Sequence, residues 1–245
     1  MALPLVLIHG FPLDSTMWRR QKRSLQRLGF TVLTPDLPGF GGRPPLPPAA
    51  NSISAFADDI AESVRHSCRR AVVAGFSMGG YVLLALLENH PDLVAGAVFI
   101  DTHSAADAQP VRQNRLAMAE TVAETGMEPV SQAMLPRLLS PTAGAGVLSA
   151  VRRMILAQSP AGIAMAQRAM ASRPDRSDLL ASIGCPALVM AGDEDMVTPP
   201  AIAHAMAALI ADCRCSIIPR SGHLSPMQAP RRVSRELAEF VTQIA

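Results

Sequence analysis

Several features that would mark particular classes of protein are missing from this chain of 245 residues. No apolar run reaches the roughly 18 residues that a membrane-spanning helix needs. The four cysteines form no CxxC pair, and no histidine stands at ligand spacing from Cys213 and Cys215. We therefore expect reduced cysteines, no bound metal, no disulfide framework and no membrane contact, in a cytoplasmic protein.

A strong net charge is absent as well. The chain carries 22 Lys and Arg residues against 20 Asp and Glu, a formal net charge of +2. This balance does not favour binding to nucleic acid or to an acidic membrane surface. The short basic pairs Arg19-Arg20, Arg69-Arg70 and Arg231-Arg232 are typical of solvated faces. Apolar residues make up 49% of the chain, enough for a globular protein with a large core.

Six short apolar runs are spread along the chain without polar and apolar residues in alternation. Strands of this kind are buried on both faces, as in a parallel sheet, and the longer segments between them have helical spacing. No positive charge precedes the first run, so we interpret it as a buried strand and not as a targeting segment. The pattern predicts an α/β fold with a mostly parallel sheet of about six strands flanked by helices. The runs are 3–8, 30–34, 71–74, 95–100, 187–191 and 213–218, and the helical segments include 18–28, 53–66, 78–89, 201–211 and 232–242.

One region breaks the alternation of strands and helices. Residues 111–180 contain helical stretches separated by glycine and proline, and no convincing strand. We predict a helical lid here, inserted between the fourth and fifth strands, with 1–110 and 181–245 forming the core. Its methionines either pack the lid helices together or line an apolar pocket, because methionine fills irregular gaps. They are Met118, Met127, Met134, Met154, Met165 and Met170.

The stretch VAGFSMGG, residues 73–80, places Ser77 between glycines, after an apolar strand and before a helical segment. This is the context in which the pattern G-x-S-x-G forms a sharp turn that exposes a nucleophilic serine. A serine hydroxyl at its ordinary pKa is a poor nucleophile, so it needs a base and a third group that orients the base.

Six histidines could supply that base, and His223 has the best position. It follows the last predicted strand, where a loop can bring it over Ser77. For the acid we favour Asp195, on the turn beyond the fifth strand. Asp193, at the end of the same strand, is the main alternative, and Asp101, at the end of the fourth strand, is the second.

Ester hydrolysis also needs amides that stabilise a tetrahedral anion. One should be the amide of Met78, which follows the serine, and the other should come from the loop after the first strand. In that loop Pro12 has no amide, so Phe11 is the natural donor. The side chains of Phe11 and Met78 should then line the substrate pocket. We interpret His9 as a structural residue that ties loops together.

Together these segments resemble the α/β-hydrolase superfamily over nearly the whole chain, and within it the small esterases and enol-lactonases with a lid of four or five helices. The resemblance rests on LIHGFPLD, TPDLPGFGG, AGFSMGGY, ENHPDLVAGAVFIDT, PALVMAGDEDMVTPP and IPRSGHLSPMQAP, in this order. It implies the catalytic residues Ser77, Asp195 and His223, the oxyanion amides of Phe11 and Met78, and a loop-organising role for Asp36. Family members usually begin with an antiparallel hairpin, which this chain lacks, so we expect a smaller sheet with six core strands.

The sequence therefore predicts a carboxylic ester hydrolase that acts on small or medium apolar acyl or aryl esters without a metal or organic cofactor. The alternatives are an enol-lactone or C–C bond hydrolase of ring-cleavage products, a cofactor-free perhydrolase, and a receptor that binds without catalysis. An arginine facing Ser77 from the lid would favour the lactone or C–C substrates, which carry carboxylates. The oligomeric state is open, and a homodimer that covers a sheet edge is one possibility.

Overall fold

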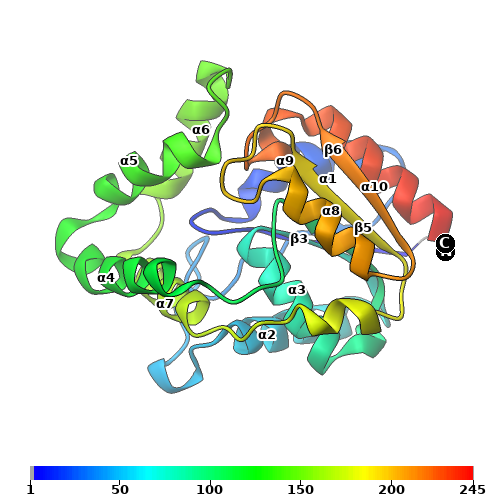
Figure 1. Cartoon of the computed structure of the whole chain (residues 1–245), viewed down its shortest axis with the longest axis horizontal. Coiled ribbons are helices and arrows are strands. Elements are labelled where there is room, and N and C mark those ends of the chain that lie inside the picture. The colour runs from blue at the N-terminus through cyan, green and yellow to red at the C-terminus, as the bar shows by residue number, and fades with distance from the viewer. Residues whose placement is uncertain (1–2, 245) are drawn as a thin grey trace.

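The structure, a computed structural model, describes residues 3–244 and contains one six-stranded sheet in the order β2-β1-β3-β4-β5-β6. Every neighbouring pair of strands is parallel. Parallel neighbours need crossover connections, and the helices between the strands supply them (Figure 1). The predicted parallel sheet of about six strands flanked by helices is confirmed.

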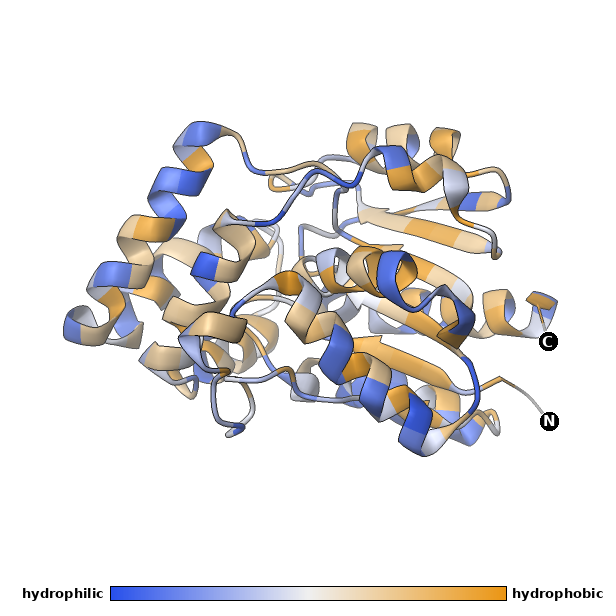
Figure 2. Ribbon diagram, turned by 90° about the horizontal axis from the view of Figure 1, so that it is seen from below, coloured by the Kyte–Doolittle hydropathy of each residue, from blue (hydrophilic) through white to orange (hydrophobic). Residues whose placement is uncertain are grey.

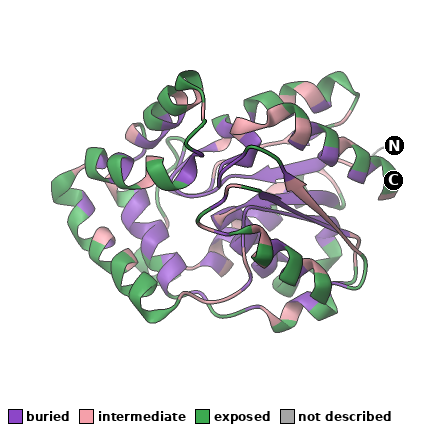
Figure 3. Cartoon of the chain, turned by 45° about the horizontal axis from the view of Figure 1, so that its top comes forward, coloured by how far each residue is buried: buried purple, intermediate pink, exposed green. Residues whose placement is uncertain are grey.

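The strands occur where the apolar runs predicted them, with ends that differ by at most two residues. The first strand begins at Leu5 and not at Leu3, because Pro4 has no amide to give to a ladder; its carbonyl accepts from Val72 instead. The central strands are buried on both faces (Figure 3) and strongly apolar (Figure 2). The bounds are β1 Leu5–Ile8, β2 Val32–Leu33, β3 Ala71–Phe76, β4 Val94–Ile100, β5 Ala187–Gly192 and β6 Cys213–Ile218.

Helices cover both faces of the sheet. Helices α1 and α10 pack together on one face, and α2 and α3 pack together on the other (Figure 1). A polar residue begins α2, where the Ser52 hydroxyl accepts from the Ala55 amide at 3.0 Å and satisfies a free donor of the first turn. The bounds are α1 Arg19–Arg27, α2 Ile53–Ser67, α3 Met78–Asn89, α8 Pro200–Leu209, α9 Ser225–Gln228 and α10 Pro230–Ile244.

Four helices stand between β4 and β5 in the chain, in the region predicted to be a lid. They form a group beside the carboxyl ends of the strands (Figure 1), in which α4 packs against α7 and α5 against α6. Gly126, with φ of 71°, separates α4 from α5. The bounds are α4 Gln109–Thr125, α5 Met127–Leu138, α6 Ala145–Leu156 and α7 Pro160–Ala171.

Within residues 3–244 no helix combines the length and the hydropathy that crossing a membrane would require. The same residues hold no group of three or more His, Cys, Asp and Glu side chains suited to a metal ion. The four cysteines are half-buried free thiols.

Candidate active site

Ser77 occupies the turn between β3 and α3 in a strained backbone conformation, with φ of 50° and ψ of −112°. Its amide donates to the Ile100 carbonyl at 2.9 Å, which fixes the turn to the neighbouring strand. Gly75 is required by packing, since a Cβ there would lie 2.2 Å from the Gly79 carbonyl oxygen. A side chain at Gly79 would in turn meet the Ile8 carbonyl oxygen at 2.6 Å. The local sequence thus allows the sharp turn that lifts the Ser77 hydroxyl above the sheet.

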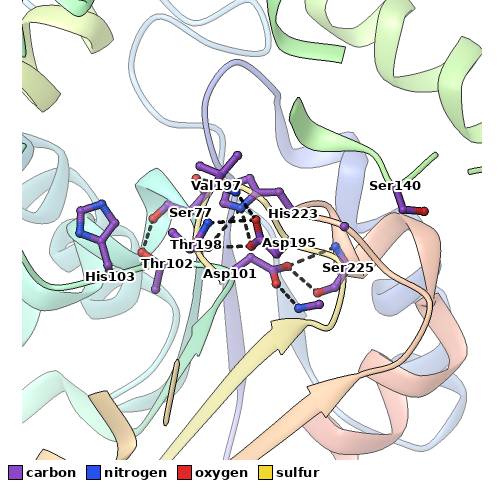
Figure 4. A network of polar contacts seen from close by, with 12 residues as sticks. Ser77, Asp101, Thr102, His103, Ser140, Asp195, Val197, Thr198, His223 and Ser225 are labelled. Atoms are coloured by element: carbon purple, nitrogen blue, oxygen red, sulfur yellow. Dashed lines mark hydrogen bonds and ion pairs between the residues drawn. The ribbon is translucent and has the colours of Figure 1, made fainter. Parts of the chain in front are cut away.

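His223 and Asp195 form a hydrogen-bonded chain with Ser77 (Figure 4). His223 Nε2 lies 2.9 Å from Ser77 Oγ, and His223 Nδ1 lies 2.8 Å from Asp195 Oδ2. The His223 and Asp195 residues are each 2% exposed. The structure therefore brings together the three residues that the sequence predicted as a catalytic set.

The Asp195 carboxylate accepts three further hydrogen bonds from its own turn. Its Oδ1 accepts from the amides of Val197 at 2.7 Å and Thr198 at 2.9 Å, and its Oδ2 accepts from the Thr198 hydroxyl at 2.7 Å. Burial alone would raise the pKa of Asp195, but the bonds from His223 and Thr198 outweigh it and hold that pKa below its ordinary value. Asp195 is therefore a fixed anion that can orient and stabilise a protonated imidazole.

The two alternative acids have other partners. Asp193 Oδ1 accepts from the Ser221 amide at 3.1 Å, at the turn before His223. Asp101 is fully buried and accepts from the Gly192 amide at 2.8 Å and from the Ser225 hydroxyl at 2.5 Å. Burial, together with the nearby charge of Asp195, raises the pKa of Asp101 well above its ordinary value. Neither alternative hydrogen-bonds to His223 within the described residues.

The backbone amides of Phe11 and Met78 are the predicted oxyanion donors. In the described part of the chain neither amide donates to a protein acceptor, and that of Met78 belongs to the open first turn of α3. Both side chains are buried, at 5% exposed for Phe11 and 0% for Met78. Their roles as oxyanion donors and as pocket residues stay predictions.

His9 and Asp36 hold the loops around the site. His9 is buried, and its Nε2 accepts from the Leu37 amide at 3.0 Å. Burial lowers the pKa of His9, so it stays neutral and can accept this bond. Asp36 Oδ1 accepts from the Ser15 amide at 2.6 Å. Both residues tie loops together, as the sequence predicted.

A second polar cluster, not found from the sequence, lies on the loop after β4. His103 Nε2 is 3.0 Å from Tyr81 Oη and 3.3 Å from Arg173 Nη2. A guanidinium has only donors, so Nε2 accepts and the neutral ring carries its proton on Nδ1. Burial, aided by the charge of Arg173, lowers the pKa of His103 to about 4. Tyr81 stands four residues after Ser77 on α3, which places this neutral histidine near the site (Figure 4).

The arginines of the region between β4 and β5 do not share one environment. Arg115 donates to Asp107 at 2.6 Å, and Arg152 pairs with Glu128 at 2.8 Å. Arg153 is exposed and lines a cleft between α6 and the core. Met154 lines the same cleft, whereas Met170 is 2% exposed and packs in the core.

A parallel sheet with a strained serine after β3, an acid after β5 and a histidine after the last strand defines an α/β hydrolase. The chain belongs to the Alpha/beta hydrolase family, whose model matches residues 5–236.

Relatives of this chain include enzymes named as esterases. A thermophilic esterase from Thermogutta terrifontis, solved with malate bound, is 38% identical, with a TM-score of 0.96 over 100% of this chain and 91% of the other. The pimeloyl-[acyl-carrier protein] methyl ester esterase of Vibrio cholerae is 24% identical over 98% of this chain and 94% of its own length. The enol-lactonase of Burkholderia xenovorans LB400, at 24% identity, has the same fold with a TM-score of 0.87 over 99% of this chain and 92% of the other. The chain is thus an α/β hydrolase with esterase relatives.

Proposed function

We propose that the protein hydrolyses carboxylic esters through an acyl-enzyme intermediate on Ser77. The observation that carries this proposal is the continuous chain from Ser77 Oγ to His223 Nε2 at 2.9 Å and from His223 Nδ1 to Asp195 Oδ2 at 2.8 Å. Such a chain is the arrangement that nucleophilic catalysis by serine requires.

In the acylation step, Ser77 Oγ attacks the ester carbonyl while His223 Nε2 takes the hydroxyl proton. The negative charge of Asp195 stabilises the resulting imidazolium and keeps the ring in place. The amides of Phe11 and Met78 bind the tetrahedral oxyanion. His223 then gives the proton to the leaving alcohol, and the carbon–oxygen bond breaks.

In the deacylation step, His223 takes a proton from water, and the water oxygen attacks the acyl carbonyl. Collapse of this second tetrahedral intermediate returns the proton to Ser77 Oγ and releases the acid. Helices α4 to α7 would act as the lid of the site, shielding the acyl-enzyme from bulk water.

Small or medium apolar acyl and aryl esters are the substrates we propose. The esterase names of the relatives support ester chemistry. The pairing of Arg115 with Asp107, and of Arg152 with Glu128, leaves these two arginines without a free charge for a carboxylate-bearing acyl group.

The test is turnover of p-nitrophenyl esters from acetate to laurate by wild type and by Ser77→Ala. We expect a burst of p-nitrophenol from wild type that is absent in the variant, and a rate that falls once the acyl chain exceeds the pocket. Ser172→Ala, at an exposed serine outside the site, is the matched control and should keep both burst and rate. Equal turnover by Ser77→Ala and wild type would contradict the proposal.

A further inference from the structure

Two clefts adjoin the loop that carries His223. The first, here the α6 cleft, has a volume of about 770 Å³ and lies between α6, the start of α1 and α9. Figure 1 shows α6 facing these elements. Its apolar wall includes Met17, Val147, Met154 and Met227. Its volume lies within the range of small-molecule sites.

The second, here the arginine cleft, has a volume of about 760 Å³ and shares Arg20 with the first. Within the described residues no acidic side chain lines it, and arginines dominate its wall. Among them only Arg232 has an ion-pair partner in residues 3–244, the Glu236 carboxylate at 2.6 Å. The five arginines are Arg20, Arg220, Arg231, Arg232 and Arg235.

The fold thus unites two basic pairs that lie far apart in the sequence. Arg19-Arg20 begins α1, and Arg231-Arg232 lies in the first turn of α10. Arg19 and Arg153 add two exposed charges to the α6 cleft. Among the described residues, the surface formed by the two clefts is thus lined by seven arginines and one acidic residue, Asp14, whose carboxylate accepts from Thr16 and Gln158.

Hydrogen bonds attach this surface to the segment around His223. Gln21, next to Arg20, donates through Nε2 to the Pro226 carbonyl at 2.7 Å. Gln228, which lines the arginine cleft, accepts at Oε1 from the Gly222 amide at 3.0 Å. Both clefts therefore adjoin the segments that flank His223, while the linings described for them include neither Ser77 nor His223.

The position of a general acid determines which part of a substrate lies beside it. His223 must hand its proton to the leaving atom, so the leaving group lies on the His223 side and the acyl group on the other. Resting on the proposed ester hydrolysis, we infer that the α6 cleft and the arginine cleft bind the leaving group of the substrate, an alcohol or thiol that carries phosphate groups.

The chemistry of the surface fits this class of ligand. Arginine presents a planar fork of donors that binds phosphate oxygens in pairs, and several arginines around one cleft match several phosphate charges. The apolar wall of the α6 cleft suits the carbon chain that joins the scissile bond to the phosphates. With a thioester, the Ser77 Oγ–carbon bond forms, the carbon–sulfur bond breaks, and the serine proton passes through His223 to the thiolate.

The experiment compares two thioesters that share the acyl group and the thiol end, butanoyl-coenzyme A and the neutral butanoyl-N-acetylcysteamine. In wild type, kcat/KM should favour the coenzyme A thioester, and added salt should reduce this preference because it screens exposed charges. In Arg20→Gln/Arg231→Gln/Arg235→Gln the ratio of the two kcat/KM values should fall about tenfold, which corresponds to about 0.5 kcal/mol for each of three exposed contacts. Arg69→Gln/Arg70→Gln, an exposed pair before the amino end of β3, should keep the wild-type ratio.

Other outcomes overturn the inference. A wild-type ratio near one, or a ratio that falls as much in the Arg69/Arg70 control, would show that the surface does not select the leaving group. If the mono-p-nitrophenyl ester of adipic acid loses turnover in the triple variant and the coenzyme A thioester does not, the arginines bind the acyl side. If wild type hydrolyses no ester or thioester, the proposed function fails. The inference about the arginines can then be tested by itself, by calorimetric measurement of butanoyl-coenzyme A binding to Ser77→Ala with and without the triple substitution.

Discussion

The hydroxyl of Ser225 donates to the carboxyl group of Asp101 at 2.5 Å, deep below the candidate site (Figure 4). Ser225 stands two residues after His223, and the other Asp101 oxygen accepts from the Gly192 amide, where the chain turns toward Asp195. One buried carboxyl group therefore links the segments that carry His223 and Asp195. Asp101 makes no hydrogen bond to the His223 imidazole in the described structure. Its effect is therefore to hold the two segments in position.

Substitution of Asp195 and of Asp101 should distinguish a direct effect on catalysis from an effect on the position of the catalytic segments. Asp195→Asn removes the anion beside His223 Nδ1 and should lower kcat by about 10³ to 10⁴. Asp101→Asn should lower kcat far less, but should reduce the free energy of unfolding by about 1–3 kcal/mol, because an amide cannot accept from both Gly192 and Ser225. Stopped-flow kinetics and urea unfolding of both variants measure the two effects.

Asp193→Asn is the matched control for these variants, since Asp193 lies two residues from Asp195 and contacts the Ser221 amide instead of His223. It should keep kcat within a few-fold of wild type. Loss of turnover in Asp193→Asn or Asp101→Asn, with Asp195→Asn fully active, would assign the acid to another residue.

Thr198 is expected to hold the Asp195 carboxylate in place through its hydroxyl, which donates to Oδ2 at 2.7 Å. Thr198→Val keeps the shape of the side chain and removes the donor. A hydrogen bond to a buried charge contributes about 1.5–3 kcal/mol, so kcat should fall about tenfold or more while KM changes little. Thr198→Ser retains the hydroxyl and should restore most of the rate. If serine and valine are equally slow, the methyl packing and not the hydrogen bond is what matters at this position.

Local sequence patterns predicted the fold and the turn at Ser77 well. An unbroken apolar run indicates a strand that is buried on both faces, whichever strands lie beside it in the sheet. All six strands could therefore be found. The turn could be predicted because Gly75 and Gly79 are required within a few residues of Ser77. The ends of strands were less accurate, since they depend on partners such as the Thr31 carbonyl, which accepts from Leu5.

Contacts between residues far apart in the chain could not be predicted in this way. Nothing in the sequence near His103 indicates that Arg173 and Tyr81 meet its ring, because the fold alone brings these segments together. The same holds for the basic pairs at 19–20 and 231–232. In the sequence each pair is typical of a solvated surface. Only the packing of α1 against α10 places the two pairs beside one cleft.

Gly75 should be intolerant of even one methyl group. Its Cβ would lie 2.2 Å from the Gly79 carbonyl oxygen, a backbone atom that cannot move without opening the turn at Ser77. Gly75→Ala should therefore lower the free energy of unfolding by about 1–3 kcal/mol, as overpacking does, and reduce kcat. Gly184→Ala, where nothing lies within 4 Å of the added atom, is the control and should be neutral or slightly stabilising. Thermal unfolding of the two variants checks the contrast, and a Gly75→Ala protein with wild-type stability and rate would contradict it.

His103 should make stability depend on pH between about 4 and 6.5. The pKa of its folded form is lowered to about 4 by burial and by Arg173, whereas the unfolded chain takes up the proton near the ordinary value of 6.5. Over this range the unfolded state binds more protons than the folded state, so the free energy of unfolding falls as the pH falls. The contribution of this one residue is about 3–4 kcal/mol at most across the full range.

His103→Gln tests this dependence, because a glutamine oxygen can accept from Tyr81 and Arg173 as Nε2 does but does not titrate. Urea unfolding at a series of pH values from 7 down to about 4.5 should give a shallower slope for the variant than for wild type. Ser172→Ala, at an exposed position that does not titrate, should keep the wild-type slope. Parallel slopes for His103→Gln and wild type would mean that the folded protein binds a proton at His103 as readily as the unfolded chain. The donor-only guanidinium of Arg173, 3.3 Å from Nε2, opposes that uptake, because a proton on Nε2 would face the N–H groups of a positively charged side chain.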